Sequence, residues 1–204
     1  MTELDPADGG VTTEVRGQIL LIGLDRPAKM NGYTPQMARQ LVDAFERLDT
    51  DDDLWCGVLF GHGAHFTAGL DLPRFHDGMK EGRRSTSGRI DPMSLGRRCC
   101  KPIVTAVQGV TFTLGIELML AGDIVVAAAD CRFSQLEPMR GIHAAGGATM
   151  RFVDRGGWGN AMYHLLTSDE FDAAEAYRIG LVQEVVPTGT QLDRAIEIAE
   201  VICT

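Results

Sequence analysis

The chain has 204 residues, a length that suits one sizeable domain or two small ones. About 45% of its residues are hydrophobic and 23% are charged, which is the composition of a globular protein and excludes a disordered or fibrous chain. The net charge of −9 argues against general nucleic-acid binding, because a basic surface supplies most of the affinity for nucleic acids. A small anionic ligand, held by a few cations and backbone N–H groups, remains compatible with this charge.

The terminal and apolar segments predict a cytoplasmic protein. Residues 1–10 are polar and acidic, and no basic segment with an apolar core follows them, so no secretory signal is expected. The longest apolar runs, such as residues 124–129, are far shorter than the roughly 20 residues that a membrane helix needs. The cysteines are odd in number and their spacings fit no zinc pattern, so we expect free thiols and no metal site.

Short strands alternate with helices along the chain. Thr34 and Pro35 give a clear boundary, because threonine is a favoured N-cap and proline is tolerated at the first helical position. Short apolar runs bounded by turn residues are typical of buried strands. The alternation indicates an α/β fold with parallel strand pairing. The predicted elements are a hairpin at 11–15 and 18–24, a helix at 35–48, a strand at 55–60, a mobile stretch at 78–89, a strand at 102–107, a helix at 115–121, strands at 124–129 and 132–134, helices at 157–166 and 172–179, a strand at 181–186 and a helix at 191–202.

Two segments place a glycine-bearing turn directly after a predicted buried strand. The first is the loop 63–71, and the second runs from the strand at 102–107 into the helix at 115–121. Turns and helix N-termini of this kind leave backbone N–H groups unpaired. Two of them that converge could form an oxyanion hole. Each segment taken alone is better explained as an ordinary strand-to-loop turn.

Two glutamates are candidates for an acid and a base. Glu117 lies within the apolar stretch 114–121, where a carboxylate is costly unless it is paired or needed. Glu137 follows the apolar region 124–134 and stands beside Pro138. Two carboxylates from separate elements can supply an acid and a base to one substrate. Their spacing in the sequence leaves open whether they meet.

Five short motifs follow one another over nearly the whole chain. They are Arg-Pro-Ala-Lys-Met-Asn at 26–31, Phe-Thr-Ala-Gly-Leu-Asp at 66–71, Lys-Pro at 101–102 leading to Gly109, Gly115 and Glu117, Gly-Asp-Ile at 122–124 leading to Phe133 and Glu137, and Asp-Ala-Ala-Glu-Ala at 172–176 leading to Gly-Leu-Val at 180–182. In this order they resemble the enoyl-CoA hydratase/isomerase (crotonase) superfamily. The resemblance implies an α/β fold with a crotonase-like ββα spiral core over residues 1–145. It also implies a C-terminal helical region over residues 146–204, truncated in this chain.

The resemblance further implies the roles of individual residues. Glu117 would hold and activate a water molecule, and Glu137 would exchange the proton at the α carbon. The backbone N–H groups of Leu70 and Leu114 would form the oxyanion hole for the thioester carbonyl. The implied reaction is syn addition of water to a trans-2-enoyl-CoA, with no metal or redox cofactor, because coenzyme A is part of the substrate. Contacts to coenzyme A or the acyl group are expected from Lys29, Ala68, Gly69, Asp71, Leu72 and Gly115.

Departures from the family pattern leave alternatives open. Thr113, Leu114 and Gly115 stand where the family has a glycine-rich turn, and the leucine side chain takes up space there. The loop 141–147 lacks the family's proline, and its His143 could reach the substrate. Another crotonase reaction, namely double-bond isomerisation, C–C hydrolysis or thioester hydrolysis, therefore remains an alternative, as does a non-catalytic acyl-CoA-binding role. The resemblance also implies a homotrimer or a dimer of trimers, with no nucleic-acid or membrane partner.

Overall fold

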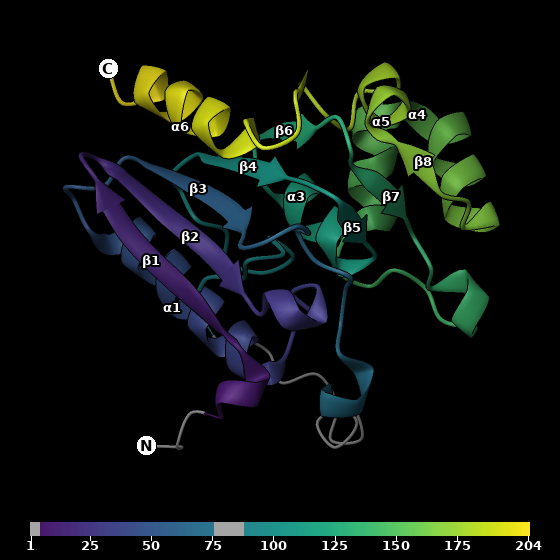
Figure 1. The fold of residues 1–204 in the computed structure, drawn as a ribbon, viewed down its shortest axis with the longest axis horizontal. Coiled ribbons are helices and arrows are strands. Elements are labelled where there is room, and N and C mark those ends of the chain that lie inside the picture. Colours follow the sequence, from purple (N-terminus) through teal and green to yellow (C-terminus); the bar gives the residue numbers. More distant parts are fainter. Residues whose placement is uncertain (1–4, 76–87) are drawn as a thin grey trace.

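The computed structural model describes residues 5–75 and 88–204 and is built around a six-stranded sheet (Figure 1). The strands are β1 (Gly10–Arg16), β2 (Ile19–Asp25), β3 (Cys56–Gly61), β4 (Ile103–Val107), β5 (Val110–Phe112), β6 (Ile124–Ala128), β7 (Arg132–Ser134), β8 (Phe171–Asp172) and β9 (Glu184–Val186). The helices are α1 (Pro35–Thr50), α3 (Leu114–Ala121), α4 (Ala148–Thr167), α5 (Ala173–Arg178) and α6 (Gln191–Ile202), with short 3₁₀ turns η1 (Pro6–Asp8), η2 (Pro27–Lys29) and η3 (Pro138–Arg140).

The large sheet has the order β1-β2-β3-β4-β6-β9, and a smaller sheet has the order β5-β7-β8. In the large sheet only β1 runs antiparallel to its neighbour, and the other pairs are parallel. Each parallel step needs a crossover, and helices or loops supply it. This arrangement confirms the predicted α/β fold with parallel pairing.

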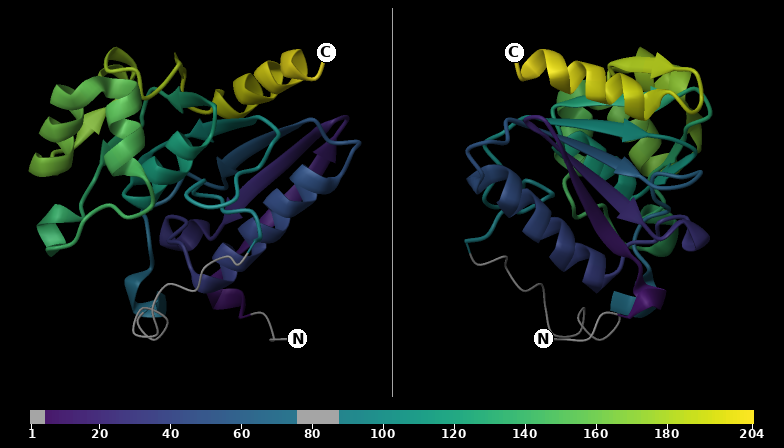
Figure 2. Two further views of the ribbon diagram at one scale, coloured as in Figure 1. Left: turned by 180° about the vertical axis from the view of Figure 1, so that it is seen from behind. Right: turned by 60° about the vertical axis from the view of Figure 1, so that its left-hand side comes forward.

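Alternate residues of β2 point to opposite faces of the large sheet. Leu20 and Ile22 belong to the core cluster that also contains residues of α1 and α3, whereas Ile19 and Leu21 pack in a second cluster with residues of α6. Figures 1 and 2 show α1 and α6 on opposite sides of this sheet. Both faces are covered, which explains why its strands read as nearly continuous apolar runs.

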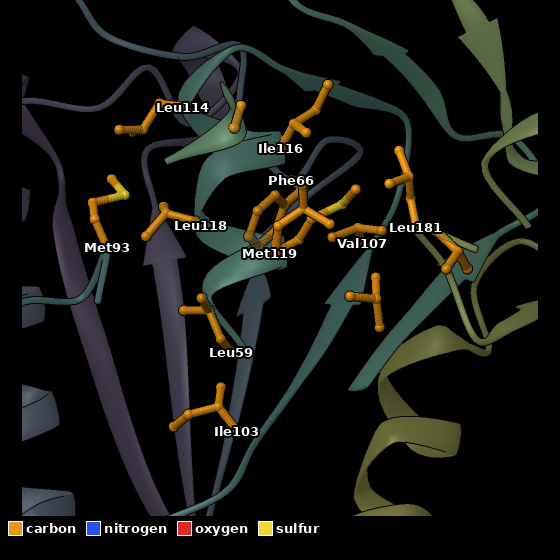
Figure 3. Packing of buried hydrophobic residues seen from close by; sticks show 14 of the residues in the cluster. Leu59, Phe66, Met93, Ile103, Val107, Leu114, Ile116, Leu118, Met119 and Leu181 are labelled. Carbon is orange, nitrogen blue, oxygen red and sulfur yellow. The ribbon is translucent and has the colours of Figure 1, made fainter. Parts of the chain in front are cut away.

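Helix α3 is buried along its whole length. Phe66, Val107 and Met119 meet between this helix and the sheet, while Leu118 lies on another side of the helix, towards Met93 (Figure 3). A close-packed core of this kind tolerates little displacement of its parts. The packing therefore fixes the helix that carries Glu117.

The N-terminal half of the chain follows the predicted elements closely. The Thr34 hydroxyl accepts a hydrogen bond from the Met37 N–H at 3.2 Å, so the predicted N-cap is confirmed, and α1 begins at Pro35. The hairpin and the strands predicted at 55–60 and 102–107 are present within one residue or two of their predicted ends. The stretch predicted as mobile at 78–89 falls largely on residues 76–87, which lie outside the described residues.

Predictions in the C-terminal third need correction. Helix α4 begins at Ala148, nine residues before the predicted start, because Gly157, with φ 75°, interrupts the helical periodicity that the sequence shows. The strand predicted at 181–186 is too long, since only Glu184–Val186 pairs with β6. Strands β5 and β8 were not predicted, because two or three residues carry no readable alternation.

The predicted division between residues 1–145 and 146–204 crosses a shared core. Phe152 and Leu165 of α4 lie in the same hydrophobic cluster as Leu20 of β2. The two predicted parts therefore share one hydrophobic core, and their division into domains stays a prediction. Among residues 5–75 and 88–204, no helix combines the length and the apolar character needed to cross a bilayer.

Candidate active site

Asn31 joins the turn after η2 to the loop that follows β3. It is fully buried, with φ 50°, and its side-chain oxygen accepts from the Arg26 N–H at 2.7 Å. Its amide nitrogen donates to the carbonyl groups of His62 and His65 at 2.9 and 2.8 Å. Its own carbonyl accepts from the Thr67 hydroxyl at 2.6 Å. One asparagine thus fixes the path of the loop that contains the first predicted oxyanion donor.

Replacing Asn31 with alanine should lower the free energy of unfolding by about 3 kcal/mol, because the Arg26 N–H and two loop carbonyl groups lose their partners. Urea unfolding measures the change. Met30→Ala is the matched control, since Met30 has a similar φ of 49° but an exposed side chain, and we expect a change within about 0.5 kcal/mol. Equal stabilities for the two variants would contradict this role of Asn31.

The two predicted oxyanion donors lie on adjoining backbone segments. Within residues 5–75 and 88–204, neither the Leu70 N–H nor the Leu114 N–H donates to a protein acceptor. Leu114 is the first residue of α3, where backbone N–H groups lack an intrahelical partner. The residues that precede the two donors are in contact, because a Cβ added to Gly69 would lie 1.9 Å from Thr113 Oγ1. The structure therefore brings both loops to one place.

The predicted coenzyme A contacts Lys29 and Ala68 lie close together. The Ala68 N–H donates to the Met30 carbonyl at 2.9 Å, and Lys29 is the exposed residue just before Met30. Gly115 lies behind this loop, since a Cβ there would lie 2.9 Å from Thr67 Cγ2. Only glycine lets α3 approach the loop this closely.

Asp71 makes its hydrogen bonds to other residues of the protein. Its carboxylate accepts from the Arg26 guanidinium at 2.7 Å, and its N–H donates to the Tyr33 carbonyl at 2.9 Å. Arg26 is only 8% exposed, so this ion pair is largely screened from water. Leu72 follows at the start of a short helical segment and is half-buried. The carboxylate of Asp71 therefore orders the loop, a role that the ligand contact predicted for this residue did not include.

Glu117 is buried, with 4% of its surface exposed, and contacts the start of α4. Its Oε1 accepts from the N–H groups of Gly146 at 2.5 Å and Ala148 at 3.4 Å. Backbone N–H groups at a helix N-terminus stabilise a negative charge through their dipoles. The start of α4 therefore supplies backbone donors that hold the Glu117 carboxyl in place.

Gly146 has no room for a side chain, because an added Cβ would lie 2.4 Å from Glu117 Oε2. Gly146→Ala should therefore displace the carboxylate and lower kcat about 10- to 100-fold, since a shift of about 1 Å costs this much in an active site. Steady-state kinetics measure the change. Gly159→Ala in the same α4 is the matched control, because open space surrounds that position, and we expect unchanged kinetics. Full activity in Gly146→Ala would contradict the placement of Glu117.

Glu137 is half-buried at the start of η3. Burial raises the pKa of its carboxyl to about 7, its own backbone N–H lowers it, and the charge of Glu117 raises it further. Its Oε2 is buried and has no hydrogen-bond partner among the described residues. The influence of Glu117 means that the two predicted catalytic carboxyls lie near each other. A carboxyl whose pKa lies near neutral pH is suited to act as a general acid.

Arg151 holds the loop before α4 in place, and no sequence motif predicts this role. Its guanidinium donates to the Gly146 carbonyl at 3.3 Å and to the carbonyl groups of Met93 and Ser94 at 2.6 and 3.1 Å. It thereby ties the loop whose N–H groups bind Glu117 to a segment more than 50 residues earlier in the chain.

His143, which the sequence analysis named as able to reach the substrate, is exposed in the loop before α4.

A family model described as enoyl-CoA hydratase/isomerase matches residues 14–204. The chain belongs to the enoyl-CoA hydratase/isomerase family. Enoyl-CoA hydratase EchA19 of Mycobacterium tuberculosis is 37% identical over 194 residues, which cover 93% of this chain and 73% of that protein. A probable peroxisomal enoyl-CoA hydratase 1 of Arabidopsis thaliana is 33% identical, covering 91% of this chain and 69% of its own length.

Solved structures of the family agree with the fold. The crystal structure of a probable enoyl-CoA hydratase/isomerase from Mycobacterium abscessus superposes with a TM-score of 0.91 and 48% identity, over 95% of this chain and 75% of that chain. The predicted crotonase fold and the assignment to an enzyme family are thus confirmed. The roles of the individual site residues stay predictions.

Proposed function

We propose that the protein is an enoyl-CoA hydratase that adds water, syn, across the double bond of a trans-2-enoyl-CoA thioester. The observation that carries the proposal is the unequal pair of glutamates. Glu117 accepts hydrogen bonds from the start of α4, and Glu137 has a pKa that burial raises to about 7. Hydration needs both a base for the water and an acid for the carbon, and this pair suits both tasks.

In the proposed step, the Glu117 carboxylate takes one proton from water as the water oxygen bonds to C3. The electron pair of the C2=C3 bond moves towards the thioester oxygen, where the N–H groups of Leu70 and Leu114 would stabilise the negative charge. Glu137 gives its proton to C2 as the carbonyl re-forms. The proton on Glu117 leaves to solvent and Glu137 regains one, so the net change is the addition of one water molecule.

Coenzyme A would be held at the exposed edge of the same loop. The exposed Lys29 ammonium would meet a phosphate, and the backbone of Ala68 would contact the adenine. Gly69, Leu72 and Gly115 would line the path of the thioester. No metal or redox cofactor takes part, because the reaction moves only protons and a hydroxyl group.

We also propose assembly into a homotrimer or a dimer of trimers in the cytoplasm. Several large apolar side chains of the C-terminal helical region are exposed. Exposed apolar surface of this kind often marks a protein–protein interface. Sedimentation velocity of the full-length protein would measure the assembly, and a monomer at micromolar concentration would contradict it. The exposed apolar residues of α4 are Met150, Trp158, Tyr163 and Leu166.

The test mixes purified full-length protein with crotonyl-CoA and follows the absorbance of the conjugated thioester, with Glu117→Ala as the control. Rapid loss of absorbance that disappears in the variant supports hydration. Binding of crotonyl-CoA without loss of absorbance would contradict it and favour another crotonase reaction or an acyl-CoA-binding role.

A further inference from the structure

Thr113 adopts a backbone conformation that residues with side chains rarely adopt. Its φ is 51° and its ψ is −113°, a strained combination for a β-branched residue. Its N–H donates to the Ser134 carbonyl at 2.9 Å, and its carbonyl accepts from the Ile116 N–H at 2.9 Å. Hydrogen bonds on both sides of the residue hold the strain in place. Strained residues are common at functional sites, and the contacts of the Thr113 side chain indicate what this one does.

The Thr113 side chain fills the space above Gly69. A Cβ built on Gly69 would lie 1.9 Å from Thr113 Oγ1 and 3.2 Å from Thr113 Cβ, and Gly69 itself has φ 98°. The Thr113 hydroxyl makes no hydrogen bond with any residue in 5–75 or 88–204. The contact is therefore packing of the side chain against the glycine backbone.

We propose that Thr113 is a positioning residue that sets the separation of the two oxyanion donors. Leu70 directly follows Gly69, and Leu114 directly follows Thr113, so the contact between the earlier pair determines how far apart the two N–H groups lie. Two donors stabilise one oxyanion only when both reach it at about 3 Å. This role rests on the proposed function. It adds a residue that takes no part in the proton transfers.

The experiment compares Thr113→Gly with Thr113→Val, because valine keeps the shape of threonine and replaces the hydroxyl that faces Gly69 with a methyl group. We expect Thr113→Gly to lower kcat for crotonyl-CoA about tenfold or more with KM within about twofold, since loosened donors act on the transition state. Its unfolding midpoint should not fall, because the backbone strain is relieved. Thr113→Val should stay within about threefold of the wild type.

Ser168→Gly is the matched control for relief of strain. Ser168 also has a positive φ, 54°, and a hydroxyl without a hydrogen-bond partner among the described residues, but it caps the C-terminal end of α4, whereas Glu117 contacts the N-terminal end. The Ser168→Gly variant should have the same kcat as the wild type. A lowered kcat in this control would overturn the assignment of the effect to Thr113.

A second readout separates this inference from the proposed function. Acetoacetyl-CoA forms an enolate that absorbs in the near ultraviolet, and an oxyanion hole favours that enolate without any turnover. If the wild type hydrates no enoyl-CoA, the proposed function fails, yet a weaker enolate signal in Thr113→Gly than in Thr113→Val still supports the spacing role. Equal signals and rates in wild type and Thr113→Gly would overturn it. Equal losses in the two variants would also overturn it, since the hydroxyl itself would then be the active part.

Discussion

Replacing Glu137 with glutamine should lower kcat for crotonyl-CoA hydration by about 10³-fold with little change in KM. Glutamine keeps the size of the side chain but has no proton to give to C2, and a positioned acid or base typically contributes a factor of about 10² to 10⁴. Steady-state kinetics of the purified variant measure both constants. Glu200→Gln on the exposed face of α6 removes the same charge and should behave like the wild type. A Glu137→Gln enzyme with unchanged turnover would contradict the assigned role.

The same carboxyl should control the pH dependence of the wild type. Burial and then the charge of Glu117 raise the pKa of Glu137 to about 7, so the protonated donor is present below that pH and lost above it. We therefore expect kcat to fall as the pH rises through about 7. A kcat that stays level up to pH 9 would show that another group gives the proton.

Glu137→Gln should also change stability in a direction opposite to activity. The folded protein holds the Glu137 proton more tightly than the unfolded chain, whose ordinary value is 4.5. The stabilisation that this proton gives is full below about pH 4.5 and is lost as the pH rises through about 7. At pH 8 the wild type carries the cost of a half-buried charge that glutamine avoids. The variant should unfold at a higher temperature at pH 8, and the difference should vanish near pH 4.

Replacing Glu117 with glutamine should lower kcat by about 10²- to 10³-fold, because the base that takes the proton from water is lost. The glutamine oxygen can still accept from the Gly146 N–H, so the loop before α4 should keep its structure. Thermal unfolding should confirm a folded protein, in contrast to Glu117→Ala, which leaves that N–H without its acceptor. Turnover of Glu117→Gln near the wild-type rate would contradict its role as the base.

Loss of the Glu117 charge should also lower the pKa of Glu137, because that charge is one cause of its elevation. An NMR titration of the Glu137 carboxyl in Glu117→Gln measures the shift directly. A pKa that stays at about 7 would mean that burial alone sets it and that the two carboxyls act independently.

The site residues are predictions from sequence motifs, and the motifs could not predict how these residues are held. A glutamate inside the apolar run 114–121 implies a partner, yet the Gly146 N–H that binds it lies 29 residues further along the chain. The raised pKa of Glu137 depends on burial, which no local pattern reports. The strain at Thr113 arises where β5 ends beside β7, and β5 was itself too short to predict.

The fold was predictable where elements have a period and a clear boundary. Thr34 and Pro35 mark the start of α1, and apolar runs mark the central strands. The start of α4 was missed because Gly157 breaks the periodicity in the middle of the helix. Long-range contacts such as those of Arg151 and Asn31 escape sequence reasoning, because they join segments more than 30 residues apart.

The central claim is that Glu117 and Glu137 together add water to an enoyl-CoA. The most direct measurement is a proton NMR analysis of crotonyl-CoA after incubation with the full-length protein in D₂O. The proposal predicts 3-hydroxybutyryl-CoA with one deuterium at C2, formed at least about 100-fold more slowly with either glutamine variant. A product with a shifted double bond, a free thiol, or unchanged crotonyl-CoA would contradict it.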